Sequence, residues 1–510
     1  MTPPQPLTHR QVLVIFSGLL LGMLLAALDQ TIVATALPRI TGDLGGLEHL
    51  SWVISAYLLA STIAMPLAGK LGDLLGRKFL FQVSIVVFLV GSVLAGMAQD
   101  MGQLIAFRAL QGLGGGGLMV LAMSIIAETV PPRERGRYQG YFGATFGLSS
   151  IAGPLLGGFI TDNLSWRWAF YVNLPVGLIA LLVITFVVPK GTRHERPVFD
   201  IAGITLMAFS VTLLVLITTW GGTEHAWGSP LILGMIAVDL TAFVALVVVE
   251  LRAQEPVIPV RLFRIKAFTV STVVSFIIGL AMFGSLGFLP LYLQTVTGSS
   301  ATASGLAMFP MMGGVLITSI ASGRLISRTG RYKIFPVLGT GIAAVGLGLL
   351  STIDDSTARN AVSLYMFVLG AGLGFVMQVM ILTAQNAVKV TELGAATGSV
   401  SFFREIGGCI GIATFGAVFT SSLQRRVGSI QLDEGLSIDL IERLPGPQQA
   451  TVISAIAESV SHVFLFAVPL MVLAFAVTWT IREVTLRGST SAVEHGAIVE
   501  VVPEMEMADA

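Results

Sequence analysis

Long apolar stretches set the strongest limit on how this chain can fold. Fourteen of them, each of roughly 20 residues, follow one another along the 510 residues, and about 20 apolar residues span a bilayer as a helix. Only 11% of the residues are charged, against about 25% in a soluble domain. The chain is therefore predicted to be an all-α polytopic membrane protein. Its spans are expected at about 12–36, 51–68, 79–98, 103–127, 138–160, 168–189, 200–220, 230–249, 267–293, 303–323, 333–352, 361–383, 397–421 and 460–481.

The distribution of basic residues predicts the orientation of these spans. With the N-terminus inside, 21 of the 29 lysines and arginines fall in inner loops and tails, six fall in outer loops and two lie within spans. Basic loops stay on the cytoplasmic side of a membrane. Both termini are therefore predicted to be cytoplasmic.

Composition and motifs also exclude several classes of function. The 29 basic and 29 acidic residues balance, so no net field attracts nucleic acid. The single cysteine, Cys409, lies in an apolar span, which argues against a disulfide framework or a cysteine metal site. The sequence contains neither a nucleotide-binding P-loop motif nor a grouping typical of a catalytic triad. No cofactor, no metal and no enzymatic activity are predicted.

A short charged segment between the second and third spans recurs in the second half. Gly69 to Lys78 contains four charges and three glycines in ten residues, and is predicted to be a tight cytoplasmic turn. An imperfect copy, residues 323–331, begins 254 positions later and has Ser327 in place of Asp73. Because this copy has no acid, we expect the role of Asp73 to be asymmetric. The chain is thus interpreted as an internal duplication, as in transporters built from two related bundles.

The duplication divides the chain into four parts. Residues 1–190 are predicted to form an N-terminal six-helix bundle, and residues 191–266 two inserted spans with their linkers. Residues 267–487 are predicted to form a C-terminal six-helix bundle with an external, mobile loop at about 422–459. The tail, residues 488–510, is acidic and rich in small residues, a composition typical of disorder.

Two charged residues interrupt apolar spans at similar depth. Asp29 lies in the first span, roughly 11 Å from its outer edge, and Arg108 lies roughly 8 Å from the outer edge of the fourth. A carboxyl in mid-span faces a bundle interior or a wet cavity, and burial favours its neutral form. The two side chains can therefore meet if their helices are neighbours. Asp29 is either a proton-binding site or a structural carboxyl that is permanently paired with a basic residue, and Arg108 is a candidate for its counter-ion.

Other span residues invite functional interpretations beside structural ones. The run Gly112–Gly117 matches a dinucleotide fingerprint, but it lies within a span, so close helix packing is the better interpretation. Glu405 follows Arg404, and adjacent helical residues point about 100° apart, so we expect the two not to face the same point. Glu405 is either a second proton or cation site or the partner of an arginine. A substrate cavity is predicted to be lined by Asp29, Gln111, Met308, Phe309, Gln378 and Glu405, although such methionines and phenylalanines commonly serve in helix packing.

Several of these motifs resemble those of one family. The segment Gly69–Lys78 resembles the signature between the second and third spans of the major facilitator superfamily. The string around Asp29 and the inserted spans resemble its fourteen-span drug:proton antiporter branch. The string Gly153-Pro154-Leu155-Leu156-Gly157-Gly158 resembles the motif of its exporters. The resemblance implies the major facilitator fold, with two six-helix bundles and two inserted helices.

The resemblance also implies roles for individual residues. Asp29 and Arg108 are implied in proton coupling, to which Glu405 is added as a departure from the branch pattern. The residues implied in a conformational switch are Gly69, Asp73, Gly76, Arg77 and Lys78, and the antiporter motif residues are Gly153, Pro154, Gly157 and Gly158. Asp239 lies in an inserted span that is peripheral in the family, which favours a structural or lipid-adjacent role.

Together these features predict a proton-driven antiporter of the plasma (bacterial inner) membrane. It would export lipophilic, often cationic, small molecules by alternating access, using the proton gradient as its energy source. Its expected partners are such substrates, protons and the lipid bilayer, and it is expected to be monomeric. The alternatives are an exporter of one endogenous product (an antibiotic, a siderophore or a lipid) and a membrane sensor or scaffold that transports nothing.

Overall fold

Helices make up almost all of the described chain. The computed structural model describes residues 9–44, 50–188, 198–222, 224–299, 301–427, 445–483 and 486. Thirteen of its helical segments are long and apolar enough to span a membrane, and a shorter apolar helix, Ile334–Leu350, brings the number to the fourteen that were predicted. The predicted fold class is therefore confirmed. The α-helices are α1 (His9–Leu44), α2 (Leu50–Leu75), α3 (Arg77–Met97), α4 (Met101–Thr129), α5 (Pro132–Asn163), α6 (Trp168–Tyr171), α7 (Asn173–Val187), α8 (Ile201–Trp220), α9 (Pro230–Arg252), α10 (Lys266–Leu286), α11 (Phe288–Thr295), α12 (Ala301–Ala307), α13 (Phe309–Thr329), α14 (Ile334–Leu350), α15 (Arg359–Asn386), α16 (Leu393–Val427) and α18 (Gly446–Trp479), and two short 3₁₀ helices are Val260–Arg264 and Val390–Glu392.

Local sequence explains where several helices begin. Asp100 caps α4 by accepting a hydrogen bond of 2.8 Å from the Gln103 N–H. Ser229 caps α9 in the same way, and Pro230 follows at the first helical position. Both devices satisfy or remove N–H groups that have no partner within the helix. The helices therefore begin at positions that the sequence marks.

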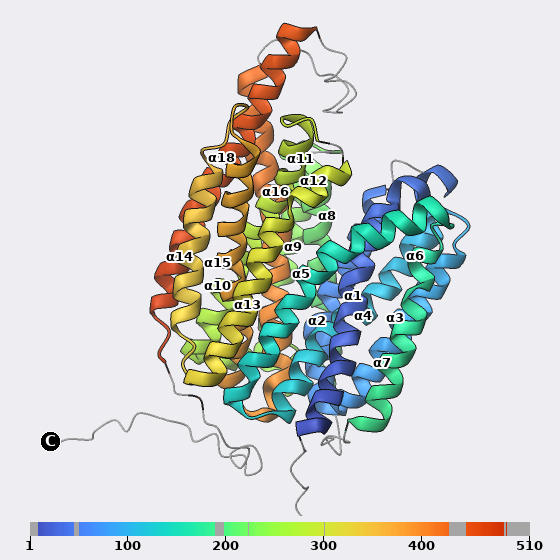
Figure 1. Ribbon diagram of the computed structural model, residues 1–510. Coiled ribbons are helices and arrows are strands. Elements are labelled where there is room, and N and C mark those ends of the chain that lie inside the picture. Colours follow the sequence, from blue (N-terminus) through green and yellow to red (C-terminus); the bar gives the residue numbers. More distant parts are fainter. Residues whose placement is uncertain are drawn as a thin grey trace, which may run out of the picture.

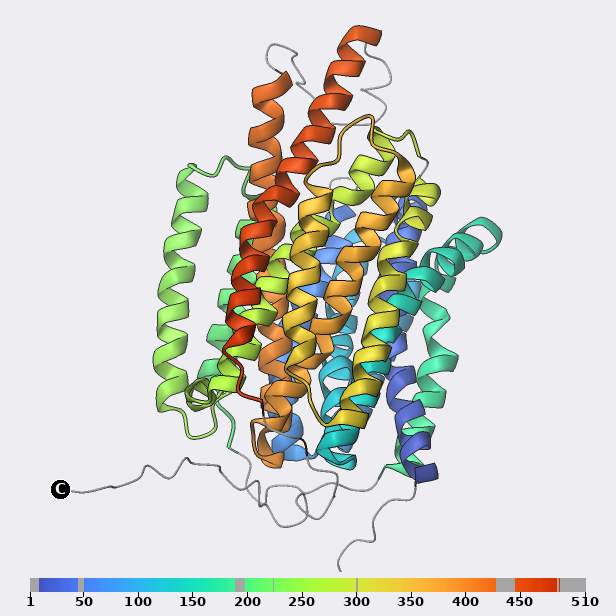
Figure 2. The same ribbon diagram turned by 60° about the vertical axis from the view of Figure 1, so that its left-hand side comes forward.

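The chain forms two halves and a pair of helices at the edge. Figure 1 shows α1–α7 on one side and α10–α18 on the other, and Figure 2 shows the inserted pair, α8 and α9, standing at the periphery. α8 contacts α9, α2 and α16. We call the end that carries Gly76 and Gly330 the inner side, because the distribution of basic residues predicts that it is cytoplasmic, and the opposite end the outer side.

The two halves are packed together on the inner side. α5 and α13 lie side by side at their inner ends and diverge toward the outer side (Figure 1). The hydrophobic cluster at the inner end of the first half includes Ile381, Ala384 and Val400 of the second half. The cluster at its outer end contains described residues of the first half alone. The conformation is therefore closed on the inner side.

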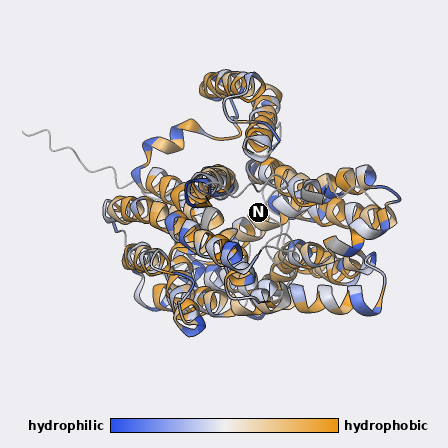
Figure 3. Cartoon of the chain, turned by 90° about the horizontal axis from the view of Figure 1, so that it is seen from above, coloured by the Kyte–Doolittle hydropathy of each residue, from blue (hydrophilic) through white to orange (hydrophobic). Residues whose placement is uncertain are grey.

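The exterior is hydrophobic, as a bilayer requires. Large apolar side chains stand exposed on several helices, among them Phe159, Phe186 and Leu240, with exposed fractions of 62%, 81% and 64%. Figure 3 shows hydrophobic residues along the helices around the rim. A soluble protein of this size would not expose so much apolar surface.

Two predicted loops prove to be helical over most of their described residues. In the predicted turn, α2 continues to Leu75 and α3 begins at Arg77, so the reversal occurs at Gly76 alone, whose φ of 97° favours glycine. The predicted external loop at 422–459 begins with the end of α16 and ends with the first 14 residues of α18, while residues 428–444 lie outside the described residues. Hydropathy alone could not reveal this because these helix ends are polar. α16 and α18 project beyond the other helices on the outer side (Figures 1 and 2).

The ninth and tenth spans are each broken. The ninth consists of α10 and α11, and the tenth consists of α12 and α13. The tail at 488–510 and the linker residues 189–197 lie outside the described residues.

Candidate functional site

Asp29 is fully buried in the first half among three side-chain donors. Its Oδ2 lies 2.5 Å from Nη1 of Arg108, and its Oδ1 accepts hydrogen bonds of 2.8 Å from the amides of Gln111 and Asn173. The exposed fractions of the Asp29 and Arg108 side chains are 0% and 1%. Burying a charge is costly unless it is paired and hydrogen-bonded, and this carboxylate is both. The structure thus brings together the two span charges that depth alone suggested could meet.

Arg108 is held by contacts besides the carboxylate. Its Nη1 donates to Oε1 of Gln111 at 2.6 Å, and its Nε donates to the carbonyl oxygen of Val53 at 3.3 Å. Its guanidinium carbon lies 4.4 Å from the centroid of the Tyr57 ring, within cation–π range. Arg108 would therefore keep several partners if Asp29 lost its charge.

Close helix packing sets the geometry of this site. A Cβ on Gly112 would lie 2.3 Å from the Tyr57 carbonyl oxygen, and a Cβ on Gly116 would lie 2.3 Å from that of Ser61. α4 therefore approaches α2 more closely than any other residue at these positions would permit. The interpretation of the Gly112–Gly117 run as a packing surface is confirmed.

Sequence reasoning missed three members of the site. Asn173 donates to Asp29, and it also donates to Ser92 Oγ at 3.0 Å, which in turn donates to the Phe170 carbonyl oxygen at 2.8 Å. Tyr57 lies under the guanidinium of Arg108. Asn173 and Ser92 are polar residues within apolar helices, and that signal could have drawn attention to them.

The antiporter motif packs against the same helix, one turn beyond Asp29. A Cβ on Gly153 would lie 1.9 Å from Oγ1 of Thr31, and one on Gly157 would lie 3.0 Å from the Ile32 carbonyl oxygen. Gly158 has no atom within 4 Å of its Cβ position, and Pro154 is exposed on the surface of α5. The first and third motif residues therefore join α5 to α1, and the other two make no comparable contact.

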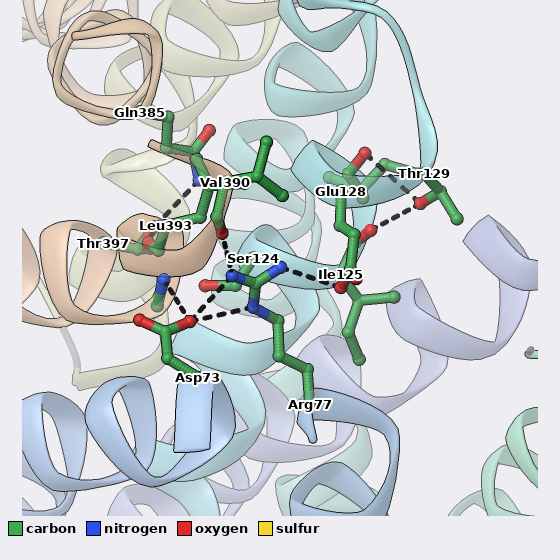
Figure 4. A network of polar contacts seen from close by, with 12 residues as sticks. Asp73, Arg77, Ser124, Ile125, Glu128, Thr129, Gln385, Val390, Leu393 and Thr397 are labelled. Atoms are coloured by element: carbon green, nitrogen blue, oxygen red, sulfur yellow. Dashed lines mark hydrogen bonds and ion pairs between the residues drawn. The ribbon is translucent and has the colours of Figure 1, made fainter. Parts of the chain in front are cut away.

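Two of the charged switch residues, Asp73 and Arg77, connect the two halves on the inner side (Figure 4). Asp73 accepts hydrogen bonds of 3.0 and 2.8 Å from the N–H groups of Gly394 and Ala395, the first residues of α16 after Leu393. Arg77 donates to Asp73 from Nε and Nη2 at 3.0 and 2.7 Å, to Glu128 at 2.8 Å and to the Val390 carbonyl oxygen. A carboxylate is stabilised at a helix N-terminus, so Asp73 holds α2 to the start of α16.

Lys78, the last switch residue, lies within the first half. Its Nζ donates to the carbonyl oxygens of Thr185 and Val188 at the end of α7. These contacts tie α3 to α7 and do not cross between the halves.

Backbone contacts reinforce this closure in two equivalent places. A Cβ on Gly69 would lie 2.2 Å from the Gly394 carbonyl oxygen, and in the repeated segment a Cβ on Gly323 would lie 2.4 Å from that of Gly136. Ser327, which replaces Asp73 in the copy, accepts a hydrogen bond of 3.0 Å from the Arg137 N–H near the start of α5. The copy thus also bonds to the facing helix, but through a neutral oxygen, and the asymmetric role expected of Asp73 stays a prediction.

A layer of amide side chains also lies between the halves. Gln139 donates to Gln385 at 3.1 Å, and Gln385 donates to Thr397 Oγ1 at 2.9 Å. Gln378, a predicted cavity residue, is 3% exposed and lies beside Gly143, and neither polar atom of its side chain has a hydrogen-bond partner in the described structure. Buried polar atoms without partners are rare. Gln378 would gain access to water when this interface opens.

Glu405 lies beside Arg404, contrary to the expectation that the two diverge. Its Oε1 is 3.7 Å from Nη2 of Arg404, because both side chains are long enough to bend toward each other. Glu405 is two helical turns outward of Gly398, on the same face of α16. A Cβ on Gly398 would lie 2.7 Å from the Met65 carbonyl oxygen of the first half. Glu405, 17% exposed, therefore lies on the face of α16 that is directed at the first half, outward of the closed contact.

The predicted cavity residues do not form one surface in this conformation. Asp29 and Gln111 are 0% exposed inside the first half, whereas Met308 and Phe309 are half-buried at the junction of α12 and α13. Among the described residues, no group of three or more histidine, cysteine, aspartate or glutamate side chains is placed to hold a metal ion.

Comparisons with known proteins agree with this architecture. Residues 19–412 match the family model described as Major Facilitator Superfamily. An uncharacterised MFS-type transporter of Mycobacterium tuberculosis is 47% identical over 479 residues, covering 93% of this chain and 70% of that one. The multidrug transporter protein MdtP of Bacillus subtilis is 42% identical over 423 residues, covering 82% and 77%. The acurin A biosynthesis cluster MFS-type transporter of Aspergillus aculeatus is 36% identical over 419 residues, covering 80% and 75%.

Solved structures share the fold at low sequence identity. The proton:xylose symporter XylE superimposes with a TM-score of 0.63 at 14% identity, covering 93% of this chain and 96% of that one. The human organic anion transporter MFSD10 gives a TM-score of 0.61 at 15% identity, covering 90% and 99%. At this identity the likeness concerns the fold alone.

Proposed function

Since the chain belongs to the major facilitator superfamily of membrane transporters, we propose that it is an antiporter that exports lipophilic, often cationic, small molecules in exchange for protons. The observation that carries the proposal is the buried pair of Asp29 and Arg108. A titratable carboxyl that is closed off from water in the membrane is costly and typical of proton relays. A relative whose name describes a multidrug transporter, MdtP, supports the substrate class. The bacterial inner membrane is the proposed location, and a monomer without cofactors is the proposed working unit.

Proton binding to Asp29 would weaken its ionic contact with Arg108. The carboxylate now accepts from Arg108, Gln111 and Asn173. A neutral carboxyl forms weaker hydrogen bonds than a carboxylate, so the attraction between α1 and α4 would fall. Gln111 and the Tyr57 ring would continue to hold the guanidinium. Protonation would thus change the contacts of α1 without leaving Arg108 isolated.

The contacts of α5 connect this site to the inner closure. Thr31, two residues after Asp29, lies against Gly153 of α5. Further along α5, a Cβ on Gly140 would lie 2.4 Å from the Ser319 carbonyl oxygen of α13. We therefore expect a shift of α1 to be transmitted through α5 to the contact between the halves. Rocking of the halves would then alternate access to a site between them.

The membrane potential sets the scale of the driving force. One charge that moves through 100 mV carries about 2.3 kcal/mol, which supports roughly a fifty-fold gradient of a neutral substrate.

Glu405, on the face of α16 that is directed at the first half, would offer a negative charge to a cationic substrate.

A dedicated exporter of one product is the second candidate. The acurin A biosynthesis cluster transporter, 36% identical, is named for a single biosynthetic cluster. A substrate screen with proteoliposomes separates the two candidates, because a multidrug antiporter accepts several unrelated cations whereas a dedicated exporter accepts one compound.

Replacing Asp29 tests the proton coupling. Asp29→Asn keeps the shape of the side chain and removes its titration. We expect this variant to lose proton-driven uptake of ethidium into inside-out proteoliposomes while still exchanging internal for external ethidium without a gradient. Retention of exchange would show that the protein is folded and binds its substrate.

Asp43→Asn provides the matched control. Asp43 also lies on α1, but it is exposed and accepts a hydrogen bond of 2.8 Å from Trp166 at the outer end. This variant should retain proton-driven uptake. If Asp29→Asn takes up as much ethidium as the wild type, the role of Asp29 in coupling is refuted. If the wild type does not move protons in exchange for ethidium, antiport is refuted.

A further inference from the structure

We propose that lipophilic cations bind at a second site, between the inserted helix pair and the second half. α8, α9, α10 and α16 contribute to a cavity of about 700 Å³, a volume typical of sites for drug-sized molecules. No described residue of the Asp29 site or of the inner closure lines it. The proposal rests on the proposed function, because it treats the substrates as membrane-soluble cations.

Aromatic rings form much of the cavity wall. The phenylalanines that line it come from both inserted and bundle elements: Phe243, Phe263, Phe276, Phe402 and Phe403. The Phe263 and Phe403 ring centroids are 5.8 Å apart and the Phe402 and Phe403 centroids are 5.5 Å apart, both edge-to-face. Aromatic faces attract cations, and clusters of them recognise quaternary ammonium groups. The wall therefore suits an apolar molecule that carries a positive charge.

Asp239 adds a carboxyl to this wall at membrane depth. It lies about 14 Å along α9 from Pro230 and about 20 Å from Arg252, within a hydrocarbon core of about 30 Å. Its Oδ1 accepts a hydrogen bond of 2.6 Å from Ser210 on α8. Phospholipid headgroups lie at the membrane surface, so lipid offers only acyl chains at this depth. A lipophilic cation, by contrast, would compensate the carboxylate.

The charged side chains that line the cavity are of one sign. A second acid, Glu250, lines it and is 4% exposed; its Oε2 accepts a hydrogen bond of 3.1 Å from the Ile258 N–H, while its Oε1 has no hydrogen-bond partner in the described structure. No lysine or arginine is among the described residues that line the cavity. Two acids without a basic neighbour in the wall favour a cationic occupant over an anionic or zwitterionic one.

Photolabelling of purified protein tests the site. The protein is reconstituted in nanodiscs of phosphatidylethanolamine and phosphatidylglycerol, and labelled with a benzophenone derivative of triphenylphosphonium. We expect the label to be found on peptides from α8, α9 or α16. Excess tetraphenylphosphonium should compete for the site and prevent this labelling. Asp239→Asn should weaken the protection by roughly tenfold, because a charge pair is lost, without altering the affinity for neutral triphenylmethanol.

Two phenylalanine variants provide a matched comparison. Phe243→Ala removes a ring from the cavity wall, whereas Phe209→Ala removes one from α8 outside it, and the two rings have similar exposed fractions of 49% and 48%. Only Phe243→Ala should weaken protection by tetraphenylphosphonium. Melting temperatures of all three variants show that each is folded.

Three results would overturn the site. The first is labelling confined to other helices, the second is equal protection in the wild type and Asp239→Asn, and the third is a phospholipid that native mass spectrometry finds still bound at saturating tetraphenylphosphonium. Because no proton gradient is present, these measurements are independent of coupling. A protein that binds the cation here but does not exchange it for protons would contradict the proposed function and leave this site in place.

Discussion

Adding one methyl group at Gly69 should open the inner side of the protein. A Cβ there would lie 2.2 Å from the carbonyl oxygen of Gly394 and 2.7 Å from its carbonyl carbon. Both atoms belong to the backbone, so no side chain can rotate away. α2 and α16 would have to separate by roughly 1 Å to restore van der Waals contact. Gly69→Ala therefore acts on the closed state and leaves the open state unaffected.

The expected size of the effect follows from this overlap. Overpacking of a tight interface costs about 1–3 kcal/mol, which corresponds to a change of roughly 5- to 150-fold in the ratio of open to closed molecules. Ser319→Cys, in a Cys409→Ser background, is a suitable reporter because Ser319 is 1% exposed at the contact between α5 and α13. Its labelling rate with an impermeant maleimide in inside-out vesicles should rise by that factor. The reporter is remote from the altered contact, so it measures separation of the halves.

Two further variants make the result decisive. Gly394→Ala places a methyl group 2.2 Å from the Gly69 carbonyl oxygen and should reproduce the effect, whereas Gly416→Ala, on the same helix, meets no atom within 4 Å. Equal labelling rates for Gly69→Ala and Gly416→Ala, in proteins with the same melting temperature, would refute the reasoning.

Two other predictions concern charged residues. Asp73→Asn should also raise the labelling rate of the Ser319→Cys reporter, because an amide accepts fewer and weaker hydrogen bonds from α16 and from Arg77. Glu128→Gln leaves Asp73 in place and should raise the rate less. A larger increase for Glu128→Gln than for Asp73→Asn would contradict this prediction. If Glu405 faces the substrate, Glu405→Gln should reduce efflux of a cationic dye more than efflux of a neutral dye. A lower melting temperature, with equal losses of efflux for both dyes, would instead indicate that Glu405 compensates the charge of Arg404.

Much of the fold could be predicted because a bilayer restricts the choices. Only helices and closed barrels satisfy their backbone groups in lipid, so hydropathy identified all fourteen spans. Helix ends were less predictable. α18 begins 14 residues before the predicted span at 460, because its first turns mix polar residues such as Gln448 and Gln449 with apolar ones and so lack a continuous apolar stretch. The segment before Gly76 was predicted to be a turn because of its charges and glycines, but its charges act from within a helix, where Asp73 bonds to the facing half and Lys70 pairs with Glu255.

The site could be predicted only where a residue was conspicuous by its charge. Asp29 and Arg108 were found because charges within spans are rare. Asn173 and Ser92 were missed because amide and hydroxyl groups are common within spans. Only their positions in three dimensions distinguish residues of the Asp29 network from residues that serve in helix packing. The cavity between α8, α9, α10 and α16 was missed for a different reason. Its lining residues come from α8, α9, the 3₁₀ helix Val260–Arg264, α10 and the distant α16, and their phenylalanines resemble any lipid-facing residue.

The projecting ends of α16 and α18 would amplify any tilt of the second half. α16 has 35 residues and α18 has 34, so each is about 50 Å long, against a hydrocarbon core of about 30 Å. Arg426 pairs with Glu458 across the two projecting ends, and α16 also packs against α18. If the second half tilts as proposed, these projecting ends would travel farther than any helix end within the membrane. A fluorophore at the tip, paired with one on the outer end of α1, would therefore report each transport cycle in intact cells without entering the transport pathway.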